Sequence, residues 1–105
     1  MTDVPESDRI LASTLAKTIA RRRKELGLTQ EEVALQAGLD RRTYQDLEYA
    51  RSDHKSNKPA NPRLTTLIRL TRVLGCDVQD LIGDAEVAYN EAEETFGPTE
   101  YRKYN

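Results

Sequence analysis

Arg41, Arg42 and Gln45 are the side chains of this sequence best suited to recognising a base pair in DNA. An arginine can donate two hydrogen bonds to the O6 and N7 atoms of guanine, and a glutamine can pair in a similar way with adenine. The two arginines follow Asp40 at the start of a short predicted helix. Cations at the N-terminus of a helix are mildly unfavourable because they oppose its dipole. That mildly unfavourable placement favours a binding role over a solvated pair of surface charges. We therefore expect these three residues to read bases.

Two short helices joined by a tight turn are predicted to position these side chains. Thr29 begins a capping box (TQEE), which marks the start of one helix, and Asp40 can cap the next. Gly38 lies where the chain must adopt a positive φ, which costs a residue with a Cβ atom about 1 kcal/mol or more. Ala34 supplies the small residue that two steeply crossing helices need at their closest approach. The pattern indicates a helix-turn-helix over residues 29–48.

The rest of the chain has the features of further short helices, and no stretch alternates in the manner of a strand. Apolar spacing, capping residues and glycines mark the helix ends. We expect helices over about 8–26, 30–37, 41–49, 62–74, 78–82 and 84–96. Residues 51–61 lack periodicity and are rich in Ser, Asn, Asp and Pro, so they should form a loop. The predicted fold class is all-α.

The net charge of −2 conceals an uneven distribution along the chain. Residues 1–8 carry three acids and no base, residues 9–72 carry 14 Lys and Arg against 7 Asp and Glu, and residues 73–105 carry 2 against 8. An anionic partner would therefore dock on the middle of the chain. We expect a flexible acidic N-terminus at 1–8, a helix-turn-helix domain at 9–83, and an acidic C-terminal helix and tail at 84–105.

Several classes of protein do not fit this sequence. No apolar run approaches the ~20 residues of a membrane span, and the N-terminus lacks the apolar core of a secretory signal. Cys76 is the single cysteine and cannot form an internal disulfide, which suits a reducing cytoplasm. His54 stands alone, and neither a catalytic set nor a phosphate-binding glycine loop is visible. We expect a cytoplasmic protein that is not an enzyme and needs no metal or cofactor.

Two segments, LTQEEVALQAGLDRRTYQDLE and PRLTTLIRLTRVLGCDVQDLIG, resemble the phage-repressor (Cro/Xre-type) helix-turn-helix regulators. The resemblance covers roughly residues 10–83 and implies the five-helix, lambda-repressor-like DNA-binding fold, in which the third helix reads the major groove. This sequence adds a long loop between the third and fourth helices and an extra C-terminal helix. Tyr44 stands where the family usually has Ile or Val, and Glu48-Tyr49-Ala50 stands where it often has Glu-x-Gly.

The resemblance also implies roles for four polar residues. Gln30 and Thr43 would contact the DNA backbone, in keeping with anion binding at helix N-termini. The alternative for Gln30 is an ordinary exposed position. Arg23 matches a family position that pairs with a glutamate, here Glu48, so we expect a partly buried structural ion pair.

The loop carries basic residues beside the third helix. Arg51, Lys55 and Lys58 are placed for phosphate contacts, each of which would add about −0.9 to the slope of log affinity against log salt. The alternative is an ordinary polar connection between two helices.

The predicted function is sequence-specific binding of double-stranded DNA by a transcriptional regulator. The expected form is a homodimer on a palindromic operator. Repression is favoured over activation because little chain remains outside the DNA-binding domain to recruit another protein. The alternative is an antitoxin-like protein whose segment 84–105 masks a partner protein and whose DNA binding serves autoregulation. The apolar stripe of residues 84–96 could pack on its own domain or on a partner subunit.

Overall fold

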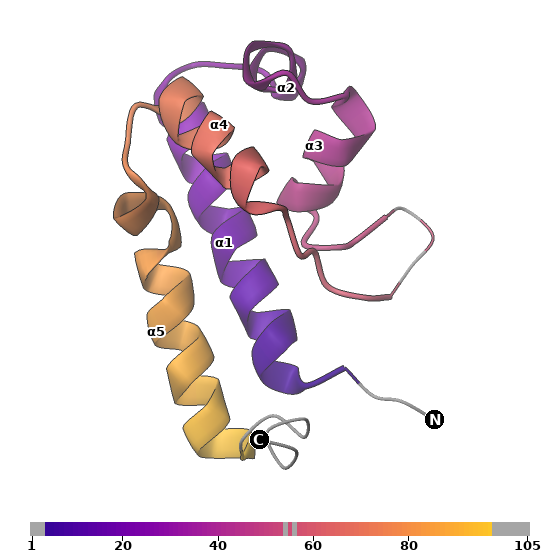
Figure 1. Cartoon of the computed structure of the whole chain (residues 1–105), viewed down its shortest axis with the longest axis vertical. Helices are drawn as coiled ribbons and strands as arrows, with labels where there is room; N and C mark the ends of the chain where they lie inside the picture. The colour runs from indigo at the N-terminus through magenta and orange to yellow at the C-terminus, as the bar shows by residue number, and fades with distance from the viewer. Residues whose placement is uncertain (1–3, 54, 56, 98–105) are drawn as a thin grey trace.

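The computed structural model describes residues 4–53, 55 and 57–97 (Figure 1). It contains α1 (Glu6–Glu25), α2 (Gln30–Ala37), α3 (Arg41–Glu48), α4 (Leu64–Leu74) and α5 (Val78–Phe96). No strand forms in this described part of the chain, where Arg51 and Pro59 make an isolated antiparallel bridge. The expected all-α class is confirmed. His54, the first three residues and the C-terminal tail from 98 onward lie outside the described residues.

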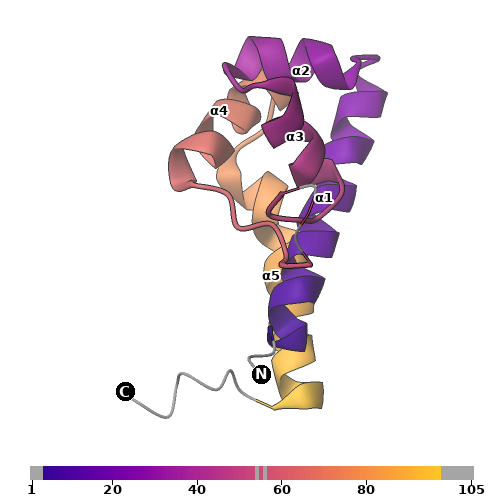
Figure 2. The ribbon, with the colours of Figure 1, turned by 90° about the vertical axis from the view of Figure 1, so that its right-hand side faces the viewer.

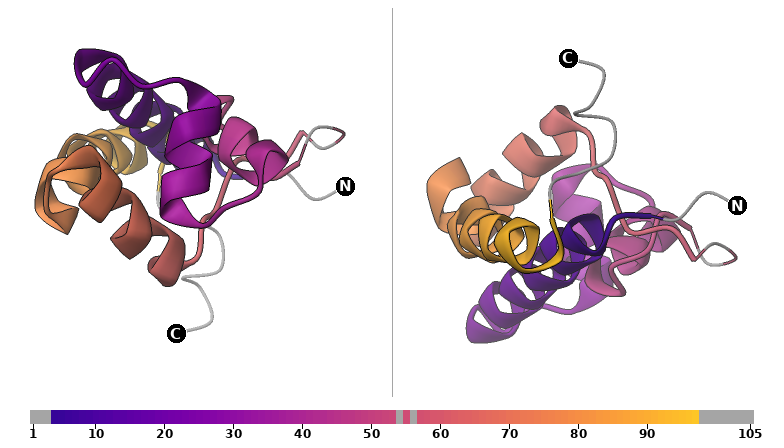
Figure 3. Two further views of the ribbon diagram at one scale, coloured as in Figure 1. Left: turned by 90° about the horizontal axis from the view of Figure 1, so that it is seen from above. Right: turned by 90° about the horizontal axis from the view of Figure 1, so that it is seen from below.

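A long antiparallel pair, α1 and α5, forms the frame of the molecule (Figure 1). The three shorter helices gather around the end of α1 that leads into α2, as Figures 1 and 2 both show. Seen along the frame from above and from below, α5 and α3 lie on different sides of α1 (Figure 3). The frame therefore separates the acidic C-terminal helix from the helix expected to read DNA.

Every helix contributes to one hydrophobic core. The five largest fully buried side chains come one from each helix, namely Ile19, Val33, Tyr44, Leu70 and Leu81. Because α3 supplies Tyr44 to a core shared by all five helices, its orientation is fixed by the packing of the whole domain.

The ends of α2 and α3 follow from local sequence signals. The Thr29 hydroxyl accepts from the Glu32 amide at 3.1 Å, and the Glu32 carboxylate accepts from the Thr29 amide at 2.8 Å. The expected capping box is therefore confirmed. Gly38 ends α2 with φ +70°, and Asp40 caps α3 by accepting from the Thr43 amide at 2.7 Å. These contacts set the turn between the two helices.

One continuous helix, α5, replaces the two that the sequence predicted at 78–82 and 84–96. It runs through Gly83 and across the expected domain boundary at 83/84. A glycine inside a helix costs about 1 kcal/mol relative to alanine. The single stripe formed by Leu81, Ala85 and Ala92 is buried, and that burial along α1 outweighs the cost of one glycine. Ala85 and Ala92 of the apolar stripe thus pack on their own domain, whereas Phe96 at its end is 62% exposed.

Two other helix starts differ from expectation. The first helix begins at Glu6, within the stretch expected to be flexible, because Ser7 is buried and donates to the Glu93 carboxylate at 3.1 Å. The fourth helix begins at Leu64, two residues later than expected. Pro59 and the next residue are drawn into backbone pairing with the chain after α3, and this pairing keeps the approach to α4 non-helical.

Replacing two glycines by alanine should change stability in opposite directions. Gly38→Ala should lower the free energy of unfolding by about 1 kcal/mol, since its φ of +70° strains any residue with a Cβ although the site has open space. Gly83→Ala should raise it by up to about 1 kcal/mol, because the new Cβ would meet only the flexible end of Gln79 at 3.0 Å. Urea denaturation of both variants measures the two changes. A lower free energy of unfolding for Gly83→Ala would contradict the cost assigned to a glycine inside α5.

Candidate nucleic-acid interface

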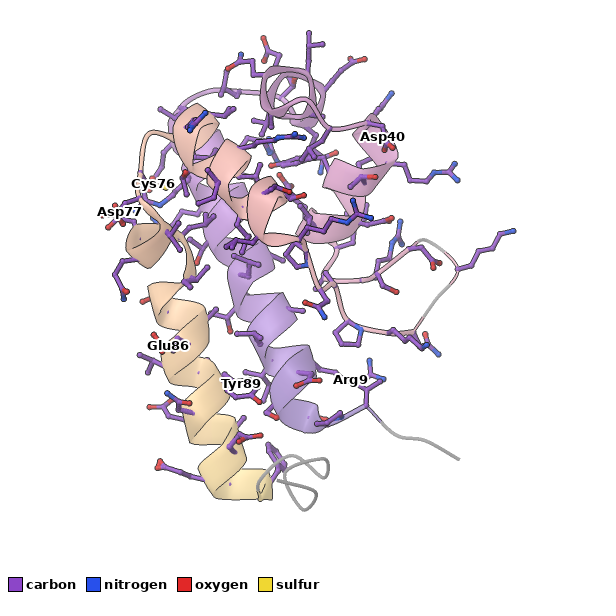
Figure 4. The ribbon with its side chains drawn as sticks, viewed as in Figure 1. Arg9, Asp40, Cys76, Asp77, Glu86 and Tyr89 are labelled. Atoms are coloured by element: carbon purple, nitrogen blue, oxygen red, sulfur yellow. The ribbon has the colours of Figure 1, made fainter. Side chains whose placement is uncertain are left out.

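The first turn of α3 projects its side chains into solvent. Arg41, Arg42 and Thr43 are all exposed, and Asp40 lies beside them at the outer end of the helix (Figure 4). The hydrogen bond from the Thr43 amide, followed by the nearby Arg42, lowers the pKa of Asp40. The cap is therefore ionised at neutral pH, and the helix start that presents the two arginines is held in place.

The opposite face of α3 is anchored by apolar contacts. Tyr44 is completely buried and Leu47 is nearly so, and both belong to the shared core. The Tyr44 hydroxyl donates to the carboxylate of Glu48. Burial and this hydrogen bond raise the pKa of Tyr44, so the phenol stays neutral and remains a donor. The residue that departs from the usual Ile or Val of the family thus adds a polar contact to an apolar anchor.

A buried ion pair joins α1 to α3. The Nε atom of Arg23 lies 2.6 Å from Oε2 of Glu48, and its Nη2 atom lies 3.0 Å from Oε1. The exposed fractions of the two side chains are 12% and 5%. Arg23 also donates from Nη1 to the Leu28 carbonyl at 2.9 Å. This bidentate geometry is the one expected for a well-formed buried pair.

Glu48 is the centre of a larger group of contacts, which we call the Glu48 network: Arg23, Gln30, Tyr44 and Glu48. Its carboxylate accepts from all three partners, including Nε2 of Gln30 at 3.0 Å. Burial acts to raise the pKa of Glu48, but the hydrogen bonds from Arg23, Tyr44 and Gln30 outweigh it, and the pKa lies below its usual value. The carboxylate is therefore ionised and can only accept.

Gln30 and Gln45 contact each other across the turn. The Nε2 atom of Gln45 donates to Oε1 of Gln30 at 3.4 Å, while Gln30 donates to Glu48. Both residues are half-buried, unlike the two arginines at the start of α3. Gln30 is therefore not fully exposed, and its contact with DNA stays a prediction. One N–H of each amide takes no part in these two contacts.

The segment between α3 and α4 is held in a defined shape by backbone pairing. The amide of Ser52 donates to the Lys58 carbonyl at 2.9 Å, and the amide of Ala60 donates to the Ala50 carbonyl at 3.1 Å. Ala50 adopts φ +59°, a conformation that glycine prefers, at the position where the resembling family often has Gly. This segment lies on the same side of the molecule as α3 (Figure 2).

Arg51 is tied back to the helix that precedes it. Its Nε atom donates to Oδ1 of Asp46 at 2.9 Å, and its guanidinium lies 4.8 Å from the centroid of the Tyr49 ring. Asp46 is buried by this contact, so the carboxylate that would repel a phosphate is neutralised. Arg51 keeps a 35% exposed side chain. It combines a structural contact with continued access to solvent.

Lys55 and Lys58 are exposed on the loop. Arg9, which the sequence did not single out, donates from Nη1 to the Asn57 carbonyl at 2.6 Å and ties this loop to α1. The Arg51–Asp46 contact could have been suspected from opposite charges five residues apart. No sequence signal pairs Arg9 with a carbonyl 48 residues away.

The exposed acids of α5 lie on the other side of α1 from α3. Exposed acids lie along α5 at Asp84, Glu86, Glu91 and Glu94, and Figure 4 shows Glu86 on the far side of α1 from Asp40 and α3. A polyanion approaching α3 would therefore meet the basic loop and the two arginines rather than these carboxylates.

The comparison with protein families decides what α2 and α3 are. Residues 19–53 match the family model described as helix-turn-helix. Within this match, α2 and α3 form a helix-turn-helix. The match extends from the middle of α1 through the first residues of the loop, so the matched residues include both members of the Arg23–Glu48 pair and the base of the loop. No curated protein and no solved structure matches the chain.

Among residues 4–53, 55 and 57–97, no cluster of three or more His, Cys, Asp or Glu side chains is arranged to hold a metal ion. None of the helices in that same part is long and apolar enough to span a membrane. Cys76 is half-buried against the core, and this burial raises the pKa of its thiol.

The stability that Glu48 contributes should depend on pH. A carboxyl whose pKa is lower in the folded than in the unfolded chain stabilises the fold above its unfolded pKa and loses this effect as pH falls through the folded pKa. Glu48→Gln should therefore lower the free energy of unfolding by about 3–5 kcal/mol at pH 7, because it leaves Arg23 buried without its counter-charge. The difference between parent and variant should narrow below about pH 4.

Urea denaturation between pH 2 and pH 7 measures that difference. The matched control is Glu94→Gln, the same change on the exposed side of α5. If the free energies of unfolding of the parent and Glu48→Gln differed by the same amount over the whole pH range, the ionised state assigned to Glu48 would be wrong.

Proposed function

We propose that this protein is a sequence-specific regulator of transcription that binds double-stranded DNA through the major groove. Arg41, Arg42 and Gln45 read bases from the first two turns of α3. The protein acts in the cytoplasm as a homodimer on a palindromic operator and represses by occluding polymerase.

The observation that carries this proposal is the contrast between the two faces of α3. One face is fixed by Tyr44 and Leu47 in the shared core, and the other exposes Arg41 and Arg42 at the helix start. A helix that is rigidly held and presents bidentate donors from its N-terminal turn meets the geometric requirement for reading base edges in the major groove.

Phosphate contacts are proposed from the elements that flank α3. Gln30 and Thr43 lie at the start of α2 and in the first turn of α3, where backbone amides also favour an anion. Arg51, Lys55 and Lys58 belong to the loop on the same side of the molecule as α3. Contacts with the DNA phosphates at both ends of a recognition helix would fix its position in the groove.

Dimer formation is supported by apolar side chains left on the surface. Leu64 and Ile68 lie one turn apart on α4 and are exposed, with Leu64 70% accessible. Leu11 on α1 and Val87 on α5 are also exposed. Leu64 and Ile68 share one face of α4, and exposed apolar side chains on one helix face are typical of surfaces that bind another protein. A second copy would place two α3 helices on one duplex.

The antitoxin-like alternative required residues 84–105 to hold a partner protein. The described part of that segment uses Ala85 and Ala92 to pack on its own α1. Val87 and Phe96 of this segment remain exposed, but their exposure does not favour a toxin over a second copy of this chain, and the regulator remains the proposal.

Selection of bound sequences from a random duplex pool tests the proposed function. We expect a two-fold symmetric site to be enriched, with half-site centres about 34 Å apart, one turn of the double helix. Enrichment of an asymmetric site would contradict the homodimer, and absence of any enriched sequence would contradict sequence-specific binding.

Loss of either arginine should weaken binding to the selected site specifically. Arg41→Ala and Arg42→Ala should each cost about 1–3 kcal/mol of binding free energy at matched salt, because each removes a bidentate contact with a base. Titrations of selected and random duplexes, with thermal melts to verify the fold, provide the measurement. The control is Arg72→Ala, which removes an exposed arginine from the last turn of α4. If both α3 variants bound the selected site as tightly as the parent, reading by α3 would be wrong.

A further inference from the structure

Three contacts hold the arginine that follows α3. Nε of Arg51 donates to Oδ1 of Asp46 at 2.9 Å, and the amide of Arg51 donates to the Asp46 carbonyl at 3.0 Å. The guanidinium also lies 4.8 Å from the centroid of the Tyr49 ring. The side chain is therefore held by its Nε edge and against an aromatic ring. Arg51 extends from the end of α3 in one orientation.

The two Nη groups of Arg51 take no part in these contacts. They have no hydrogen-bond partner within the described part of the chain, and the side chain is 35% exposed. Arg51 and Thr43 both line a cavity of about 410 Å³ between α3, the loop and the start of α4. Two parallel N–H groups match two oxygens of one phosphate. The held arginine can therefore bind a phosphate only where the DNA brings one to this cavity.

Asp46 opposes any other position of Arg51. Its side chain is 9% exposed, and Arg51 is the cation paired with it. If Arg51 turned away to reach a distant phosphate, this nearly buried carboxylate would lose its counter-charge and would face a polyanion. Both the lost pairing and the repulsion oppose that movement. Arg51 is thus kept for phosphates within reach of its restrained guanidinium.

We propose that Asp46 is a positioning residue that increases the discrimination between the operator and other DNA by restricting where Arg51 can bind a phosphate. This inference rests on the proposed function. On the operator α3 sits in the major groove, so the phosphates take one position relative to Arg51. Random DNA is bound in many registers through phosphate contacts. A restrained arginine finds a phosphate in few of these registers, so Asp46 lowers affinity for random DNA more than affinity for the operator.

A general electrostatic effect of Asp46 predicts a different result. Any acid close to the DNA repels the phosphates of every sequence, so its removal should tighten binding to operator and random duplexes alike. Glu31 supplies the comparison, because it is an exposed acid in the first turn of α2 and is not part of the Arg51 contacts.

The test measures dissociation constants for the selected operator and for random duplexes over a range of salt concentrations. Asp46→Ala removes the acceptor of the Arg51 hydrogen bond, and Asp46→Asn keeps a weaker, uncharged acceptor. Glu31→Ala and Glu31→Gln are the matched controls, and Asp46→Ala combined with Arg51→Ala identifies effects that require the arginine. Thermal melts establish which variants fold, and Asp46→Asn carries the test if Asp46→Ala does not fold.

We expect the ratio of the random to the operator dissociation constant to fall about fivefold in Asp46→Ala at about 0.15 M salt, which is the effect of one phosphate contact. The fall should be smaller in Asp46→Asn, and tighter binding to random DNA should account for both. On random DNA the slope of log affinity against log salt should become more negative by about 0.9 in Asp46→Ala, because the released Arg51 adds one phosphate contact. The double variant should show neither the tighter binding nor the steeper slope, and the Glu31 controls should keep the ratio of the parent.

Equal changes in affinity for both duplexes in the Asp46 variants would reduce Asp46 to a general charge and overturn the inference. A slope on random DNA equal to that of the parent would also overturn it. If the parent itself binds operator and random duplexes equally, the proposed function fails. If the parent discriminates and the Asp46 variants keep its ratio, the inference alone fails.

Discussion

The carboxylate of Glu48 accepts hydrogen bonds from three helices in a place nearly closed to water, and the geometry of the helix-turn-helix depends on it. Arg23 comes from α1, Gln30 from α2 and Tyr44 from α3. Removing two charges from water costs several kcal/mol per ion, so such a pair adds little net stability over an apolar substitute. The pair instead orients the helices, because each hydrogen bond to Glu48 fixes the position of its donor. Packing alone would hold the helices together with less control over their rotation.

The loop between α3 and α4 illustrates a second way of fixing geometry. A long connection loses much conformational entropy when it is ordered, and a few separate contacts hold the described residues of this one. Backbone pairing joins its two ends, Arg51 binds Asp46 at the end of α3, and Arg9 binds the Asn57 carbonyl from α1. Each contact is modest. Together they keep a group of basic residues beside α3, so that less ordering remains for the moment of binding.

Sequence signals anticipated those parts of the structure that depend on nearby residues. The capping box at Thr29, the positive φ of Gly38 and the cap at Asp40 are each set within a few residues, and all are present. The continuity of α5 through Gly83 could not be predicted in this way, because it depends on burial against α1 at the other end of the chain. The hydrogen bond from Arg9 to the loop is accepted by the backbone carbonyl of Asn57. Every residue has such a carbonyl, so no residue type in the sequence indicates this contact. Gln30 and Gln45 were predicted as independent contacts with DNA. Their contact with each other depends on how α2 and α3 pack, which the sequence does not show.

The pairing of the first helix with the last has a consequence for how the domain forms. Ser7 and Glu93 are 86 residues apart and share a hydrogen bond. The five largest fully buried side chains likewise come one from each helix, and Leu81 comes from the last. During synthesis the N-terminal residues leave the ribosome first, so α1, α2 and α3 exist for a time without the surface that covers them. Closing so long a loop is slow compared with forming the helices themselves. The helix-turn-helix therefore acquires its final rigidity only as the last helix closes onto the first, and a chain truncated before α5 would lack the frame on which α3 is oriented.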